Sequence, residues 1–155
     1  MKNLSLIICI VILFSCKENA TTNEENQINE TTLEIDSLEG AWKLVSFFNY
    51  RGDGTVDTIL SSKTNKQIKM YSPTKVMWSR TRISDSIDWF AYGDYNVKNG
   101  VLTEILDYGS KSMNEVIKDK TEFKFNINIT ENEFSQIEID SLGHPIFAEN
   151  YIRIE

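Results

Sequence analysis

Two neighbouring stretches near the C-terminus alternate apolar and polar residues with a period of two. Residues 123–129 read FKFNINI, beginning with Phe123 and Phe125, and residues 135–140 (SQIEID) repeat the pattern. Successive side chains of a β-strand point to opposite faces, so this period predicts half-buried strands. A chain built from such segments has to fold into sheets that bury one face.

Turn-forming sequences separate the β-forming runs at close intervals. Asn99-Gly100 is the strongest of them, because a type I′ hairpin turn needs a positive φ at both central residues. Short strands joined by such turns predict antiparallel neighbours. The candidate turns are Arg51-Gly52-Asp53-Gly54, Ser72-Pro73-Thr74, Ser84-Asp85-Ser86, Lys98-Asn99-Gly100, Thr130-Glu131-Asn132-Glu133 and Ser141-Leu142-Gly143-His144-Pro145.

Helix-forming sequence is scarce over residues 38–155, the length of one compact domain. We expect a single short helix at about residues 111–118 (KSMNEVIK). Many short strands at hairpin spacing with at most one short helix predict an all-β fold. Both an antiparallel barrel and a sandwich fit this pattern.

The N-terminus has the features of an export signal. Lys2 precedes an apolar run at residues 4–14, which is too short to span a bilayer. The run ends at Leu13-Phe14-Ser15-Cys16, which resembles the lipobox of bacterial lipoproteins. The resemblance implies a signal peptide over residues 1–15 and a lipid anchor on Cys16. The alternative is an ordinary buried cysteine in a first helix.

The segment after this cysteine is polar. Residues 16–37 are rich in Glu, Asn and Thr and contain no aromatic residue. Such a composition cannot bury enough apolar area to offset the entropy of ordering, so we expect a disordered tether. Cys16-Lys17-Glu18 also resembles the charged tags that send some Gram-negative lipoproteins to the cell surface, although a solvated linker has the same composition. We expect lipid anchoring to the outer membrane, on its periplasmic or surface-exposed face.

Cysteine count and charge restrict the partners. Cleavage before Cys16 removes Cys9, so neither a disulfide nor a thiolate metal site remains in the mature chain. The formal net charge is −7 and becomes −8 when Lys2 is lost. A chain this acidic is not attracted to nucleic acid or to an anionic membrane surface. Membrane attachment therefore has to come from the acyl chains.

Both ends of the 38–155 segment resemble the lipocalins and their calycin relatives. Gly40-Ala41-Trp42 matches their Gly-x-Trp opening, and Arg153 lies near the end of the last β-forming run. The resemblance implies a lipocalin-like up-and-down barrel of about eight to ten strands. Gly40, Trp42 and Arg153 would close one end of it, since a guanidinium can stack on an indole and still bond nearby carbonyls.

The middle of the chain resembles a group of bacterial lipocalin-like lipoproteins of uncharacterised function. The resemblance covers most of residues 38–155 and implies a fold rather than an activity, because one fold hosts many functions. The matching stretches are Lys69-Met70-Tyr71-Ser72-Pro73-Thr74, Val76-Met77-Trp78, Ala91-Tyr92-Gly93-Asp94-Tyr95 and Leu102-Thr103-Glu104, followed by Tyr108.

Residues that carry catalysis or bind metals are sparse. His144 is the only histidine and has neither a second histidine nor a cysteine to accompany it. Asp53 and Asp57 have the spacing of a calcium loop, but the later carboxylates of such a loop are missing. No serine, cysteine or lysine is placed in a motif with an activating base. We therefore expect a protein that is not an enzyme and needs neither a metal nor a cofactor.

The aromatic residues of the middle strands suggest a lined cavity. Both faces of the run from Ile87 to Tyr95 carry aromatic residues, so alternation does not decide which face points inward. One interpretation is a barrel filled by its own side chains. The other is a ligand cavity with Arg80 or Glu104 as a polar anchor. Its expected lining residues are Trp78, Phe90, Tyr92, Tyr108 and Phe123.

Two classes of function follow. In the first, a cell-envelope protein binds a small hydrophobic or amphiphilic ligand such as a fatty acid in its barrel. In the second, the acidic surface of the barrel binds another envelope protein, as an interaction module or inhibitor. A large aromatic-lined void favours the first, and a filled barrel with a contiguous exposed apolar patch favours the second.

Overall fold

The computed structural model describes residues 37–83 and 87–155. The signal peptide, Cys16 and nearly all of the expected tether lie outside the described residues, as does the candidate turn at Ser84-Asp85-Ser86. Within the described part, no helix is long and apolar enough to cross a membrane.

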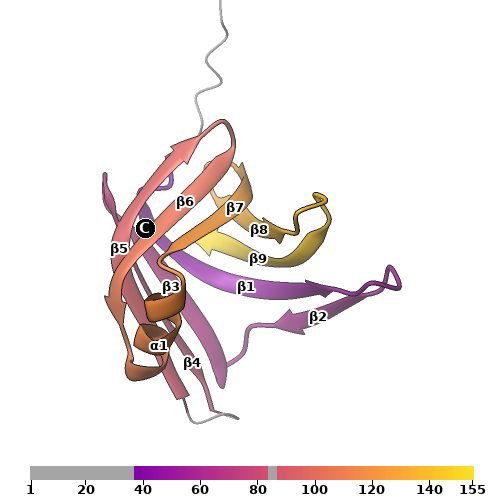
Figure 1. Cartoon of the computed structure of the whole chain (residues 1–155), viewed down its shortest axis with the longest axis horizontal. Helices are drawn as coiled ribbons and strands as arrows, with labels where there is room; N and C mark the ends of the chain where they lie inside the picture. Colours follow the sequence, from indigo (N-terminus) through magenta and orange to yellow (C-terminus); the bar gives the residue numbers. More distant parts are fainter. Residues whose placement is uncertain (1–36, 84–86) are drawn as a thin grey trace, which may run out of the picture. The chain divides into compact units, whose positions relative to one another are not determined.

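The described residues form nine strands and one helix, and every pair of neighbouring strands is antiparallel. Eight strands form a ring because β1 pairs with both β3 and β9, while β2 adds to β1 outside this ring (Figure 1). The expected all-β barrel with one short helix is confirmed. The elements are β1 (Gly40–Tyr50), β2 (Val56–Leu60), β3 (Asn65–Tyr71), β4 (Lys75–Arg82), β5 (Ile87–Lys98), β6 (Val101–Gly109), α1 (Lys111–Asp119), β7 (Glu122–Ile129), β8 (Glu133–Ile139) and β9 (Pro145–Arg153).

The strongest expected turn has the backbone that its sequence requires. Asn99 and Gly100, between β5 and β6, have φ angles of 53° and 74°. Both central residues of this hairpin therefore have the positive φ of a type I′ turn. The Arg51–Gly54 sequence forms the tip of the β1–β2 hairpin, where Asp53 Oδ1 accepts hydrogen bonds from the backbone N–H and the hydroxyl of Thr55.

Strand β1 changes partners along its length. Its first residues, Gly40 to Lys43, pair with β3, and its last residues, Ser46 to Tyr50, pair with β2. A register shift between Leu44 and Ser46 marks the change. The β1–β2 hairpin (purple) consequently extends away from β3 in Figure 1, while β9 (yellow) accompanies β1 on its other edge.

Helix α1 follows β6 and packs on the barrel. Ser110 begins it, since its Oγ accepts a hydrogen bond of 3.3 Å from the backbone N–H of Met113. Met113 is buried in the core cluster. Gly109 permits this close packing, because a Cβ there would overlap the Phe90 carbonyl oxygen and the Met113 side chain.

One end of the barrel is closed by a dense aromatic core. Trp42 is completely buried, and its ring meets Phe134 edge-on at 4.9 Å. Phe134 stacks on Tyr151 at 4.5 Å. Burial of these large apolar side chains stabilises the fold, and together they fill this end of the barrel. Leu44, Val76 and Leu102 complete the core here.

The expected contact between Trp42 and Arg153 is present at this closed end. The two are direct cross-strand partners, and the guanidinium lies 4.0 Å from the indole centroid. Arg153 also donates hydrogen bonds to the carbonyl oxygens of Ser37, Glu39 and Glu131. Gly40 has a φ of 121°, and a Cβ there would overlap the Arg153 guanidinium and the Glu155 carbonyl. The glycine, tryptophan and arginine thus form one closure.

Candidate functional site

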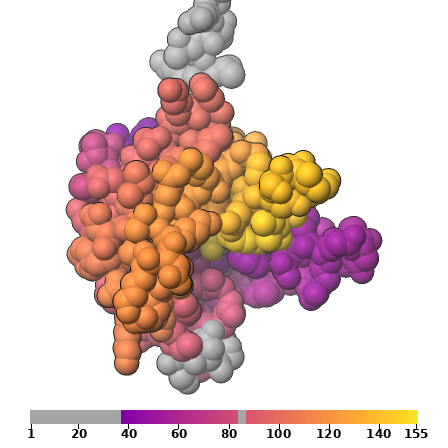
Figure 2. Space-filling model, viewed as in Figure 1, coloured from indigo at the N-terminus to yellow at the C-terminus, as the bar shows by residue number. Residues whose placement is uncertain are grey.

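The other part of the interior holds a half-open cavity of about 290 Å³. This volume lies near the lower limit of ligand pockets, which are commonly about 300–1,000 Å³. In Figure 2 the surface is hollowed where α1 and β7 (orange), β9 (yellow) and β1 (purple) approach one another. The lining residues are Gln67, Lys69, Trp78, Arg80, Trp89, Glu104, Leu106, Met113, Val116, Phe123, Phe125, Gln136, Phe147 and Glu149.

Most of the cavity wall is apolar. Trp78 on β4 and Trp89 on β5 provide the indole surfaces, and Phe123 and Phe147 come from the far side of the barrel. Helix α1 contributes Met113 and its neighbour Val116. A wall of aromatic rings and aliphatic groups suits an apolar guest, and the rings can pair with an aromatic one.

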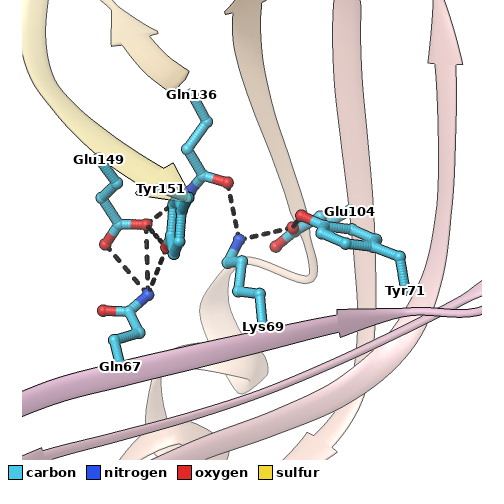
Figure 3. Close-up of polar contacts among 7 residues, drawn as sticks. All are labelled: Gln67, Lys69, Tyr71, Glu104, Gln136, Glu149 and Tyr151. Carbon is cyan, nitrogen blue, oxygen red and sulfur yellow. Dashed lines mark hydrogen bonds and ion pairs between the residues drawn. The ribbon is translucent and has the colours of Figure 1, made fainter. Parts of the chain in front are cut away.

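Seven side chains from four strands form a hydrogen-bonded network inside the barrel, which we call the polar belt (Figure 3). Its members are Gln67, Lys69, Tyr71, Glu104, Gln136, Glu149 and Tyr151.

One half of the polar belt centres on a buried ion pair. Lys69 and Glu104 are each 2% exposed, and the lysine Nζ lies 2.7 Å from Glu104 Oε1. Lys69 also donates to Gln136 Oε1 at 2.8 Å. The Tyr71 hydroxyl donates to the same Glu104 oxygen at 2.7 Å. Charges this deeply buried persist only when paired and hydrogen-bonded, and this arrangement meets both conditions.

The other half holds the Glu149 carboxylate with neutral donors. Glu149 Oε2 accepts hydrogen bonds from the Tyr151 hydroxyl at 2.6 Å and from Gln136 Nε2 at 2.8 Å. Gln67 Nε2 donates to the Tyr151 hydroxyl at 2.7 Å and reaches both carboxylate oxygens at 3.3 Å. Gln136 therefore joins the two halves, because it accepts from Lys69 and donates to Glu149.

The two tyrosines of the polar belt are held in their protonated form. Burial raises the pKa of Tyr71 well above its ordinary value, and the nearby negative charge of Glu104 adds to the effect. Burial likewise raises the pKa of Tyr151, with Glu149 as the nearby charge. Each phenol therefore remains a hydrogen-bond donor to its carboxylate.

Arg80 brings a second cationic group to the cavity. It is the direct cross-strand partner of Gln67 on β3 and of Trp89 on β5. Its guanidinium lies over the Phe47 ring, 5.8 Å from the centroid. Among the ion pairs of the described residues, none involves Arg80, so its guanidinium is available to an anionic group.

The cavity contains four of the seven expected ligand-binding residues. Trp78, Arg80, Glu104 and Phe123 line it. Their roles in binding remain predictions.

The other three expected residues do not line the cavity, which corrects our expectation for them. Phe90 and Tyr108 are 41% and 54% exposed, and the Tyr92 ring lies 5.5 Å from that of Tyr108 on the outer face. The physical reason is the direction of β5, which turns Trp89 and the fully buried Ala91 inward, so Phe90 and Tyr92 point outward.

Four polar residues of the site were not expected from the sequence, namely Gln67, Lys69, Gln136 and Glu149. On β8 the period of two is correct, but the inward face carries Gln136, whereas Ile139 is 39% exposed. A polar residue that alternates with apolar ones normally marks the solvent face of a strand. No pattern in the sequence distinguishes these buried polar residues from exposed ones, since their partners lie on distant strands.

A second cavity, of about 410 Å³, lies at the fork where β1 leaves β3 and pairs with β2. Lys43, Lys63 and Lys66 are among its lining residues, and Gln67 lines both cavities. The fork is thus bordered by positive charge, although the chain as a whole is acidic.

The outer face of β3–β6 carries a group of large exposed side chains around the half-buried Tyr92, which we call the outer patch. It consists of Met70, Met77, Phe90, Tyr92 and Tyr108. The strand register places Met70 opposite Met77, Met77 opposite Tyr92, and Tyr92 opposite Tyr108. These side chains are therefore continuous across four strands.

Comparison with known proteins supports the fold. No protein-family model matches the chain. No curated protein matches it in sequence either. In structure it is similar to a lipocalin-like protein from Bacteroides uniformis, with a TM-score of 0.51 and 16% identity over 76% of this chain and 98% of that one. An uncharacterised protein from Bacteroides eggerthii aligns with a TM-score of 0.49 and 16% identity, over 76% of this chain and 99% of that one. The chain is an eight-stranded antiparallel barrel with a lipocalin-like fold.

Proposed function

We propose that the barrel binds a small hydrophobic or amphiphilic compound in its aromatic-lined cavity. The observation that carries this proposal is the combination of an apolar wall with a few convergent buried polar groups. Binding sites for small molecules commonly have this composition, because the wall supplies affinity and the polar groups fix orientation. Arg80 and Glu104 are the proposed polar anchors, and Trp78 and Phe123 the apolar contacts.

The proposal includes a place in the cell envelope. The N-terminal sequence supports export and a lipid anchor on Cys16, with the barrel held at the outer membrane. The role is binding rather than catalysis, because the sequence offers no activated nucleophile. The acidic charge of −7 argues against nucleic acid as a partner.

A titration with a blocked variant tests the binding proposal. The mature chain from residue 16, carrying Cys16→Ser, is titrated with naphthalene derivatives and short-chain fatty acids, and tryptophan fluorescence is recorded. Val116→Trp adds bulk at the cavity wall and should abolish binding. Ile139→Trp is the matched control, because Ile139 is similarly exposed but lies away from the cavity. Equal binding by both variants would place the ligand elsewhere.

The outer patch favours a second candidate function, docking of an envelope protein. Contiguous exposed apolar side chains are typical of interaction surfaces. Chemical cross-linking in native envelopes tests it, comparing the unmodified chain with Met77→Glu. A partner that cross-links equally to both forms does not use this patch.

A further inference from the structure

The polar belt has hydrogen-bond acceptors left over, and Glu104 supplies the first. Its Oε1 receives the hydrogen bonds of both Lys69 and Tyr71. Its Oε2 accepts none from any described residue, and Glu104 lines the cavity. A carboxylate can accept several hydrogen bonds on each oxygen, so half of this group's capacity is unused.

Gln67 holds a second unused acceptor, which is too deeply buried to face the cavity. Its Oε1 is a buried atom with no hydrogen-bond partner, although its Nε2 is fully engaged. The amide orientation follows from chemistry, since turning it over would place the carbonyl oxygen against the Glu149 carboxylate. Arg80 does not satisfy Oε1 either, because its guanidinium lies over the Phe47 ring.

The charges of the polar belt agree with this surplus of acceptors. Two carboxylates, Glu104 and Glu149, face a single ammonium group, that of Lys69. The hydroxyl hydrogens of both tyrosines are already donated to those carboxylates. A group that enters the cavity beside Glu104 therefore meets oxygen acceptors and negative charge, whereas Arg80, the cross-strand partner of Gln67, supplies a separate positive charge. The surface beside Glu104 is complementary to a hydrogen-bond donor.

The cavity also restricts the body of the ligand. Its volume of about 290 Å³ is small, and indole and phenyl rings form much of its wall. Flat aromatic compounds pair with such rings in stacked or edge-on geometry and lose little conformational entropy on binding. The shape and the wall both favour one or two fused rings over a long flexible chain.

We propose that the cavity selects compact aromatic ligands that carry a hydroxyl or amino group and direct this donor to Glu104 Oε2 at the polar belt. The inference rests on the proposed function, since it names the ligand class of the same cavity. A ligand of this size that lacks a donor displaces water from Glu104 Oε2 but offers this oxygen no hydrogen bond in return. An unsatisfied buried acceptor is costly, so such a ligand binds more weakly.

A pair of nearly isosteric compounds tests the proposal on the mature chain carrying Cys16→Ser. The probes are 2-naphthol and 2-methylnaphthalene, which differ by a hydroxyl in place of a methyl group. Their dissociation constants are measured by energy transfer from the cavity tryptophans. We expect 2-naphthol to bind at least about tenfold more tightly, the ratio that one satisfied buried acceptor produces.

Two variants locate the effect at the polar belt. Glu104→Gln keeps an oxygen for Lys69 and Tyr71 but places an NH₂ group where Oε2 was, so the tenfold preference should fall to about one. Glu104→Asp withdraws the carboxylate from the cavity by one methylene group and should reduce the preference if Glu104→Gln does not fold. Phe90→Ala, on the outer face, is the control and should retain the preference.

The outcomes separate this inference from the proposed function. Tight binding of 2-naphthol alone, lost in Glu104→Gln, supports both. Equal binding of the two probes overturns the donor preference but leaves a ligand-binding barrel. A preference that survives both belt variants also overturns it, because the donor then contacts another group. If neither probe binds, and octanoate and octanol also fail, the proposed function itself is wrong.

Discussion

Arg153 lies 4.0 Å over the indole ring of Trp42 while donating hydrogen bonds to three backbone carbonyls. These carbonyls belong to Ser37, Glu39 and Glu131. One side chain of the last strand is therefore hydrogen-bonded both to the segment before β1 and to the β7–β8 turn. Hydrogen bonds from a guanidinium combined with stacking on a buried ring stabilise the closed end more than either would alone.

Removal of this arginine should destabilise the barrel. We expect Arg153→Ala to lower the free energy of unfolding by about 2–4 kcal/mol, because packing and several hydrogen bonds are lost together. Arg51→Ala, at the exposed tip of the β1–β2 hairpin, is the control and should cost far less stability. Urea melts measure both. An Arg153→Ala loss as small as that of the control would contradict the closure.

The closed end could be predicted because the resemblance to the lipocalins implies it, through residues at the two ends of the domain. Gly40 and Trp42 stand together at the start of the domain, and Arg153 stands near its end. Asn99-Gly100 similarly requires a particular turn, and both residues have the positive φ that the turn demands. Few other structural roles fit a Gly-x-Trp at the start of a domain or an Asn-Gly between two β-forming runs. The sequence therefore restricts the structure strongly at these points.

The polar belt could not be predicted because its residues are far apart in the sequence and meet only when the barrel closes. Gln67 precedes Ile68 and Gln136 precedes Ile137, as polar residues on a solvent face would, and Glu149 stands beside the polar Asn150. They are buried because barrel closure brings β3, β8 and β9 around one interior. The direction of β5 was undecided for a similar reason, since Trp89 and Phe90 are both aromatic and only the register shows which points inward.

The buried ion pair should matter more than an exposed one. We expect Lys69→Met to cost about 3–5 kcal/mol, because it leaves Glu104 as an uncompensated buried charge. Lys75→Met breaks the exposed pair with Asp94 and should cost far less stability, because solvent screens exposed pairs. Denaturant unfolding compares the two. The prediction is wrong if the two substitutions lower the free energy of unfolding by the same small amount.

Alkaline pH should destabilise the fold through the two belt tyrosines. The pKa values of Tyr71 and Tyr151 are raised in the folded protein. Their contribution to the free energy of unfolding is therefore complete below the ordinary tyrosine pKa of about 10. Above that pH the unfolded chain loses these protons while the folded protein keeps them. The free energy of unfolding should therefore fall as the pH rises from about 10 towards the raised values.

A tyrosine variant checks the assignment of this alkaline effect. Tyr71→Phe removes one of the two titrating groups, so the decline in stability above pH ~10 should become shallower. Tyr108→Phe is the matched control, because that ring is 54% exposed. Urea melts at several pH values give the slopes. Identical slopes for the unmodified chain and Tyr71→Phe would show that the decline has another origin.

The lipid anchor has a direct genetic test. Cys16→Ser removes the sulfur that would carry the lipid, so the variant should be released from membranes or keep its signal sequence uncleaved. Fractionation of cells followed by mass measurement of the product distinguishes these results. A variant that is processed normally and still partitions into detergent would rule out a lipidated Cys16.

Arg80 should decide how strongly the cavity holds an anionic head group. Its guanidinium matches a carboxylate bidentately, and no described carboxylate forms an ion pair with it. We expect Arg80→Ala to weaken binding of octanoate about tenfold, the equivalent of one charge-assisted hydrogen bond, and to change binding of octanol by less than about twofold. Lys66→Ala is the control, because Lys66 lines only the fork cavity. A similar loss for octanol would mean that Arg80 contributes packing rather than charge, and a loss in Lys66→Ala would place the carboxylate at the fork.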